Sequence, residues 1–129
     1  FIGSPAMNLL AGEIVGTGAQ TTVKLATGGT AVSAVPTSTA DMGLKVNIGV
    51  RPEDMVPCDD CDAIYTGKVD ILEALGEVTL LYFEKNGAAD PVIGKLPGIH
   101  ADMRGQTVSL RAVPEKVQIF HNGKSLYYR

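Results

Sequence analysis

The stretch from residue 49 to 62, GVRPEDMVPCDDCD, gathers the residue types that most often perform chemistry in proteins. Cys58 and Cys61 form C-x-x-C, the spacing of half a zinc site or of a thioredoxin-type redox pair. A structural zinc ion needs four ligands, and the only histidines, His100 and His121, are isolated and far apart in the sequence. The cysteine pair therefore indicates at most an incomplete zinc site.

A redox role for Cys58 is disfavoured by its neighbours. Reactive cysteines of this type lie at a helix N-terminus, where the helix dipole stabilises the thiolate. Here a proline precedes Cys58 and carboxylates surround it, which disfavours a thiolate electrostatically. We therefore expect a solvent-exposed acidic loop with incidental cysteines, and we keep a metal or redox role for Cys58 and Cys61 as an alternative hypothesis.

The carboxylates of this stretch also raise the question of a calcium site. An EF-hand loop needs alternating Asp or Asn ligands, a central glycine and a terminal glutamate. None of that order is present, so a solvated acidic loop is the better interpretation. The acidic residues concerned are Glu53, Asp54, Asp59, Asp60 and Asp62.

Arg51, Pro52 and Glu53 predict a turn at the start of the same stretch. Proline fixes φ for the first turn position, and we expect Arg51 and Glu53 to lock the turn by hydrogen bonds or as an ion pair. An exposed pair of this kind contributes less than about 1 kcal/mol. We interpret the three residues as scaffold rather than as ligand contacts.

No nucleotide site or catalytic constellation can be identified along the chain. Gly123-Lys124-Ser125 repeats the end of a phosphate-binding P-loop, but Gln118 stands where that motif needs its first glycine. Other glycine-rich stretches lack the dinucleotide-binding spacing, and two scattered histidines support no serine–histidine–acid arrangement. The sequence predicts no enzymatic activity, cofactor or metal site in this chain.

Composition limits the class of protein. The chain has 129 residues, a formal net charge of −3, 45% hydrophobic and 19% charged residues, which predicts one globular domain with a substantial core. No apolar run approaches the ~20 residues that cross a bilayer, and no secretory signal is recognisable. Scattered basic residues, 5% aromatic residues and no tryptophan argue against a nucleic-acid partner.

Short runs of β-branched and apolar residues between glycines and prolines predict an all-β barrel or sandwich. Residues 69–76 could form two helical turns, but length and flanking glycines favour a strand that ends at Gly76, a positive-φ or bulge position. Asn122 and Gly123 predict a type I′ hairpin turn. Period-2 alternation predicts further strands at 20–25, 44–50, 78–83, 107–113 and 117–121.

A faint internal repeat relates residues 12–25 to residues 67–83. Each copy has a glycine, an apolar residue two positions later, a second glycine and then a threonine. In the first copy the last two are Gly18 and Thr21, and the second copy has three extra residues. The repeat predicts two similar strand–turn–strand units that could build a small barrel.

Four short motifs, taken in order, resemble one known family. They are I-G-S-P-x-M-N near the start, G-V-R-P-E at 49–53, L-E-x-L-G at 72–76 and P-E-x-V-x-x-F at 114–120. Together they resemble the C-terminal regulatory region of ATP-binding subunits of carbohydrate-uptake ABC importers, the group typified by the maltose transporter's ATPase subunit. The resemblance covers nearly the whole chain and implies an OB-fold-like small β-barrel, the TOBE module, with additional short strands.

The resemblance also implies how the chain is organised. Residues 1–7 would be a linker from an absent nucleotide-binding domain, and residues 8–129 would be the regulatory β-barrel domain. The chain begins at Phe1 without an initiator methionine, so we expect it to be part of a longer polypeptide. That parent would bind ATP and Mg²⁺ in its N-terminal domain and couple ATP hydrolysis to uptake of sugars or related solutes.

The implied role of this chain is regulation and homodimer formation. Paired regulatory domains would hold two ATPase halves at effective concentrations on the order of millimolar, through a two-fold patch of about 800 Å² per partner. The parent would bind transporter membrane subunits on the cytoplasmic face of a bacterial or archaeal membrane. A regulatory protein or metabolite could also bind, and would regulate only as far as its affinity differs between states.

An alternative function is a small-ligand sensor, because related barrel modules bind oxyanions such as molybdate. No family role can be transferred to Cys58 and Cys61. The residues interpreted structurally are the turn Arg51, Pro52 and Glu53, the glycine Gly76, and the expected barrel-core residues Val117 and Phe120.

Overall fold

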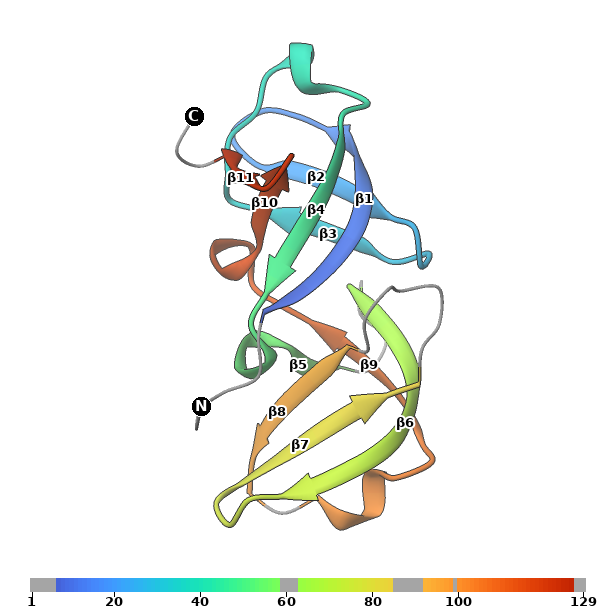
Figure 1. Cartoon of the computed structure of the whole chain (residues 1–129). Helices are drawn as coiled ribbons and strands as arrows, with labels where there is room; N and C mark the ends of the chain where they lie inside the picture. The colour runs from blue at the N-terminus through green and yellow to red at the C-terminus, as the bar shows by residue number, and fades with distance from the viewer. Residues whose placement is uncertain (1–6, 59–62, 85–91, 99, 127–129) are drawn as a thin grey trace.

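The computed structural model describes residues 7–58, 63–84, 92–98 and 100–126, which form two antiparallel β-sheets (Figure 1). The six-stranded sheet has the order β11-β10-β4-β1-β2-β3, and the five-stranded sheet has the order β5-β9-β6-β7-β8. The strands of the six-stranded sheet are β1 (Asn8–Gly16), β2 (Thr21–Leu25), β3 (Thr30–Ser33), β4 (Lys45–Val50), β10 (Gln118–His121) and β11 (Lys124–Ser125). Those of the five-stranded sheet are β5 (Val56–Cys58), β6 (Tyr65–Ala74), β7 (Val78–Phe83), β8 (Ile93–Pro97) and β9 (Thr107–Arg111). Four short 3₁₀ turns connect them: η1 (Thr39–Asp41), η2 (Pro52–Asp54), η3 (Ala101–Met103) and η4 (Pro114–Lys116).

The all-β prediction is confirmed, and alternation explains most of the strands. Residues 69–76 belong to the long strand β6 and not to a helix. Asn122 and Gly123 both have positive φ, 52° and 79°, and they close the β10–β11 hairpin as predicted. Strands β3, β5 and β8 were not predicted, and β1 and β11 were anticipated only through the internal repeat and the hairpin turn.

The internal repeat corresponds to two antiparallel hairpins, β1–β2 and β6–β7. In each hairpin the first strand carries a register shift, between Ile14 and Gly16 in β1 and between Val69 and Ile71 in β6. The shift in β6 is a bulge that turns Ile71 to the outer face, where it is 54% exposed. The two units were expected to build one barrel together, whereas the structure places one in each sheet (Figure 1).

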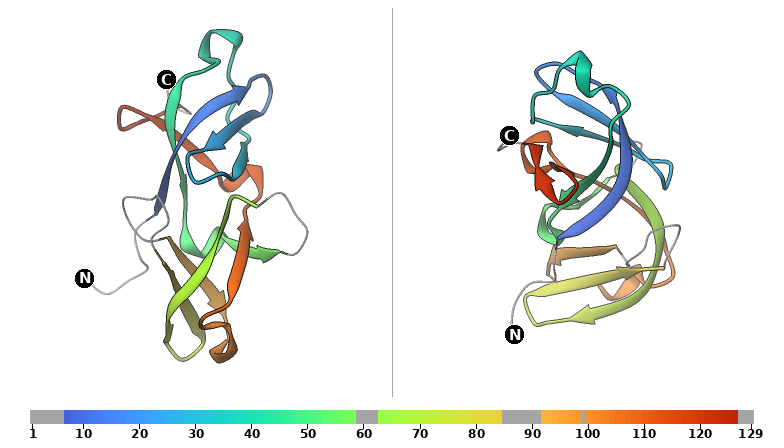
Figure 2. Two further views of the ribbon diagram at one scale, coloured as in Figure 1. Left: turned by 90° about the vertical axis from the view of Figure 1, so that its right-hand side faces the viewer. Right: turned by 45° about the horizontal axis from the view of Figure 1, so that its top comes forward.

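One hydrophobic core serves both sheets. Ile14, Ile48 and Ile119 from the six-stranded sheet and Leu81 and Leu110 from the five-stranded sheet are fully buried in the same cluster. The rings of Tyr65 and Phe83 add an edge-to-face contact, with centroids 5.4 Å apart. Because the cluster is shared, the two sheets stabilise each other, and Figure 2 shows one sheet above the other in both additional views.

Contacts with backbone groups connect the sheets directly. The side-chain amide of Asn8 in β1 donates to the Ile93 carbonyl at 2.8 Å and accepts from the Ile93 N–H at 2.9 Å, as a paired strand residue would. Gly29, between β2 and β3, lies against the Ile64 carbonyl before β6. The Asn8 side chain therefore provides a strand-like pair of hydrogen bonds between β1 and β8, which belong to different sheets.

Candidate functional site

The chain passes between the two sheets through two proline–glutamate turns. The turn η2 joins β4 to β5, and η4 joins β9 to β10. The residues before the prolines, Arg51 and Val113, have nearly identical extended backbones, with ψ of 147° and 148°. In both turns proline occupies the first position, as its fixed φ favours, and the residue that follows the turn is buried. The G-V-R-P-E motif thus lies at one of two matched sheet-to-sheet connections.

The turn at Arg51 is held by its backbone and not by its charged side chains. The Asp54 N–H donates to the Arg51 carbonyl at 2.9 Å, and the Met55 N–H donates to the Pro52 carbonyl at 3.3 Å. Pro52 is buried, whereas Arg51 and Glu53 are exposed. Within the described part of the chain their side chains form no hydrogen bond or ion pair with each other, so the expected side-chain lock is absent.

The two turns enclose a polar pocket of about 310 Å³. Three carboxylates and two cations line it, so the pocket is mixed in sign with a slight acidic excess. No described side chain in it has a nucleophile-and-base arrangement that would suggest catalysis. The lining residues are Arg51, Glu53, Asp54, Glu115, Lys116 and Gln118.

The other structural residues are placed as follows. Gly76 has φ +84° and lies in the turn between β6 and β7, with open space around it, so its backbone conformation and not crowding requires glycine. Val117 is 2% exposed and lies in the core. Phe120 is not in the core as expected: it is half-buried on the outer face of its sheet, and its neighbour Ile119 takes the core position. The reason is the strand period, because adjacent residues of β10 face opposite sides.

The cysteine stretch is only partly described. Cys58 ends β5 and is disulfide-bonded, so it is not an incidental free thiol. Cys61, Asp59, Asp60 and Asp62 lie outside the described residues, and the predicted acidic loop stays a prediction there. Among the residues that the structure does describe, no group of three or more histidine, cysteine or acidic side chains could hold a metal ion.

The outer face of β6, β7 and β8 carries a row of apolar side chains, of which Ile71 is exposed and Tyr82 and Ile93 are half-buried. The strand register places Ile71 opposite Tyr82 and Tyr82 opposite Ile93. Glu73 and Lys95 flank Leu80 in the next row on the same face. Leu80 is 4% exposed although it lies outside the shared core, so this face has a small apolar cluster of its own. We call it the β6–β8 face.

Tyr82 connects the apolar and polar parts of the β6–β8 face. Its hydroxyl donates to the Glu73 carboxylate at 3.5 Å. Burial raises the pKa of Tyr82 above its ordinary value, and the neighbouring Glu73 charge and the hydrogen bond raise it further. The phenol therefore stays protonated and serves as a donor through neutral and mildly alkaline pH.

Sequence reasoning missed one residue that joins the sheets. Asn8 is 6% exposed, and its side-chain amide both donates to the carbonyl and accepts from the N–H of Ile93. The sequence did hold a signal for this role, because Asn8 ends the FIGSPAMN motif as a polar residue at a strand position that faces the core.

Among the described residues, the structure contains no helix with the length and apolar character of a membrane span.

Comparison with protein families gives two matches that divide the chain near η2. A family described as the MalK OB fold domain matches residues 3–55, and a family described as the TOBE domain matches residues 48–120. The boundary coincides with the first connection between the sheets. The first family covers all of β1 to β4, and the second covers the five-stranded sheet and β10 up to Phe120.

Curated relatives include two groups of transport proteins. The α-glucoside transport ATP-binding protein AglK of Rhizobium meliloti is 45% identical over 126 residues, which cover 97% of this chain and 35% of the relative. The maltose/maltodextrin import ATP-binding protein MalK of Vibrio cholerae is 32% identical over 95% of this chain and 33% of its own length. The chain thus spans about a third of the length of the curated relatives it matches.

Among solved structures, the chain resembles a cytoplasmic molybdate-binding protein, ModG, with molybdate bound. The TM-score is 0.69, and the match covers 92% of this chain and 99% of the ModG chain. Sequence identity is 13%, so the likeness concerns the arrangement of the strands alone.

Proposed function

The chain belongs to the TOBE domain family and carries the MalK OB fold, and we propose that it is the regulatory and pair-forming part of an ABC importer's ATP-binding subunit. The observation that carries the proposal is the 45% identity to AglK over nearly the whole chain. Both named relatives are ATP-binding proteins of sugar transport. The imported solute is accordingly a sugar or a related compound.

The remainder of such a subunit would supply the chemistry. ATP and Mg²⁺ would bind in a nucleotide-binding domain outside this chain, and this chain would have no ATPase activity of its own. The whole subunit would bind the transporter's membrane subunits from the cytoplasmic side, and a regulatory protein or metabolite would bind this chain. The oxyanion-sensor alternative is supported only by the shared fold with ModG, at 13% identity, and is therefore less favoured.

We assign the pairing surface to the β6–β8 face. Exposed apolar clusters on a soluble domain commonly mark protein–protein contacts, and this one combines Ile71, Tyr82 and Ile93 in one row. Glu73 and Lys95 lie beside the row with opposite charges, so a two-fold axis can bring the acid of one copy near the base of the other.

Replacing Ile71 with glutamate is expected to raise the dimer dissociation constant about tenfold or more, because a charge would be buried at the centre of the contact. Sedimentation velocity over a range of concentrations measures the change. Val15→Glu is the matched control, since Val15 is 44% exposed on the six-stranded sheet, away from the face. Equal weakening by both variants, or none by Ile71→Glu, would contradict the assignment of this surface.

A further inference from the structure

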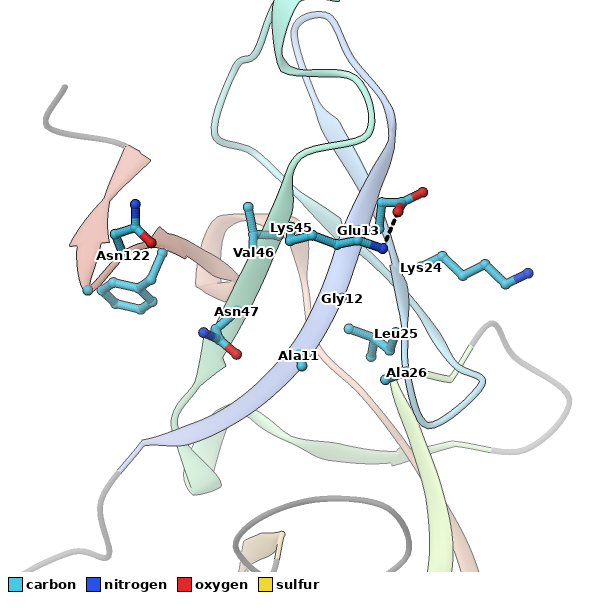
Figure 3. Close-up of a pocket in the computed structure, with 12 residues that line it drawn as sticks. Ala11, Gly12, Glu13, Lys24, Leu25, Ala26, Lys45, Val46, Asn47 and Asn122 are labelled. Carbon is cyan, nitrogen blue, oxygen red and sulfur yellow. Dashed lines mark hydrogen bonds and ion pairs between the residues drawn. The ribbon is translucent and has the colours of Figure 1, made fainter.

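A second surface, on the six-stranded sheet, has the features of a small-ligand site. A groove of about 570 Å³ lies on its outer face, between β10 and β2 (Figure 3). Its volume is within the range of about 300–1,000 Å³ that small-molecule sites occupy. It is formed by residues of β1, β2, β4, β10 and the β10–β11 turn, and no sequence motif predicted a ligand site there.

The strand register builds one wall of the groove from charges. Glu13 of β1 lies opposite Lys45 of β4 on one side and opposite Lys24 of β2 on the other. Lys45 crosses β1 to pair with Glu13, as Figure 3 shows. The row thus holds two cations around one carboxylate, and its net positive charge favours an anionic group on the ligand.

The next row in register supplies a ring and an amide. Phe120 lies opposite Asn47, which lies opposite Ala11. A Cβ at Gly49 would lie 2.7 Å from the Phe120 ring. The ring therefore packs against the bare backbone of Gly49, and any side chain there would displace it. Asn122, at positive φ in the adjoining turn, also lines the groove. Ala11 and Ala26, whose side chains are small, line the part of the groove toward β2.

These features select a class of ligand. An aromatic ring offers a flat apolar surface for the C–H face of a sugar ring, and the amides of Asn47 and Asn122 can donate to and accept from its hydroxyls. The lysine row, two residues further along the strands, would then meet a charged substituent. A neutral sugar would leave the cations unused, and a bare anion would leave the ring unused.

We propose that the groove binds a phosphorylated sugar, with the sugar ring on Phe120 and the phosphate at Lys45 and Lys24. A regulatory role for this ligand rests on the proposed function. A kinase reaction acting on imported sugar would produce the phosphorylated sugar inside the cell, and its binding to the groove would signal that uptake is sufficient. The groove and the β6–β8 face lie on different sheets, so ligand binding and pairing can be measured separately.

Isothermal titration calorimetry of the chain with glucose 6-phosphate, glucose, inorganic phosphate and AMP tests the proposal. Glucose 6-phosphate should bind about tenfold or more tightly than the other three, since it alone engages both rows. Comparable affinity for inorganic phosphate would reveal a simple anion patch and overturn the proposal. Tighter binding of AMP, or no detectable binding of glucose 6-phosphate, would overturn it as well.

Variants locate the site. Lys45→Ala should weaken glucose 6-phosphate binding about tenfold or more through loss of a charge-assisted contact, and Asn47→Ala, at an exposed position, should weaken it less. Lys68→Ala is the control, because Lys68 is exposed on β6 in the other sheet. Unchanged affinity in both Lys45→Ala and Asn47→Ala, with circular dichroism showing intact folds, would overturn the placement. If glucose 6-phosphate does not bind but the chain still dimerises, this inference is rejected and the proposed function stands.

Discussion

Replacing Asn8 with alanine is expected to lower the free energy of unfolding by about 2–4 kcal/mol. The side-chain amide satisfies both the N–H and the carbonyl of Ile93, and alanine leaves these partly buried groups without a partner. Each lost hydrogen bond contributes about 0.5–1.5 kcal/mol, and each buried group left unsatisfied costs about 1–3 kcal/mol, with partial recovery by water. Urea denaturation followed by circular dichroism measures the change.

Asn47→Ala is the matched control for Asn8→Ala. Asn47 lies on the neighbouring strand β4 and is exposed, so its replacement should change stability by less than about 0.5 kcal/mol. Asn8→Asp should lower stability at least as much as Asn8→Ala at neutral pH, because an ionised carboxylate would be buried there with an acceptor facing the Ile93 carbonyl. If Asn8→Ala lowers the free energy of unfolding no more than Asn47→Ala does, the link between β1 and β8 contributes little to stability.

Replacing Gly29 with alanine is expected to cost about 2–3 kcal/mol or more, the upper range for overpacking. A Cβ there would lie 2.2 Å from the Ile64 carbonyl oxygen and 2.9 Å from its carbon. Because these are backbone atoms, no side chain can rotate away, and the β2–β3 turn would have to separate from the segment before β6. Thermal and urea unfolding measure the loss.

Thr27→Val controls for disturbance of the same turn. The Thr27 hydroxyl is buried and has no hydrogen-bond partner among the described residues, so removing it at nearly constant shape should be neutral or stabilising. A similar loss in Thr27→Val and Gly29→Ala would show that the turn is simply sensitive. A Gly29→Ala variant as stable as the unmodified chain would contradict the close backbone contact between the sheets.

Local features of the fold could be predicted from the sequence, and long-range ones could not. Strand β6 was recognised over 69–76 because glycines bound an apolar run, and the Asn122–Gly123 turn because few residues accept two positive-φ positions in succession. The division into two sheets depends on pairings such as β4 with β10, which join residues far apart in the chain. Period-2 alternation gives each strand a face but does not say which strands share a sheet.

The same limit applies to the candidate sites. The motif at Arg51 to Glu53 was correctly identified as a turn, yet its matched partner at Pro114 and its place between sheets appear only in three dimensions. Phe120 was expected in the core together with Val117, but one step of the strand period places it outside and Ile119 inside. The groove could not be predicted because its rows combine β1, β2, β4 and β10 through register alone.

The central claim, that this chain pairs two copies of an importer's ATP-binding subunit, is tested most directly by sedimentation equilibrium of the unmodified chain. The chain has a mass of 13.5 kDa, and the account predicts a concentration-dependent equilibrium between this mass and twice this mass at micromolar concentrations. A single species of 13.5 kDa that persists into the high micromolar range would contradict it.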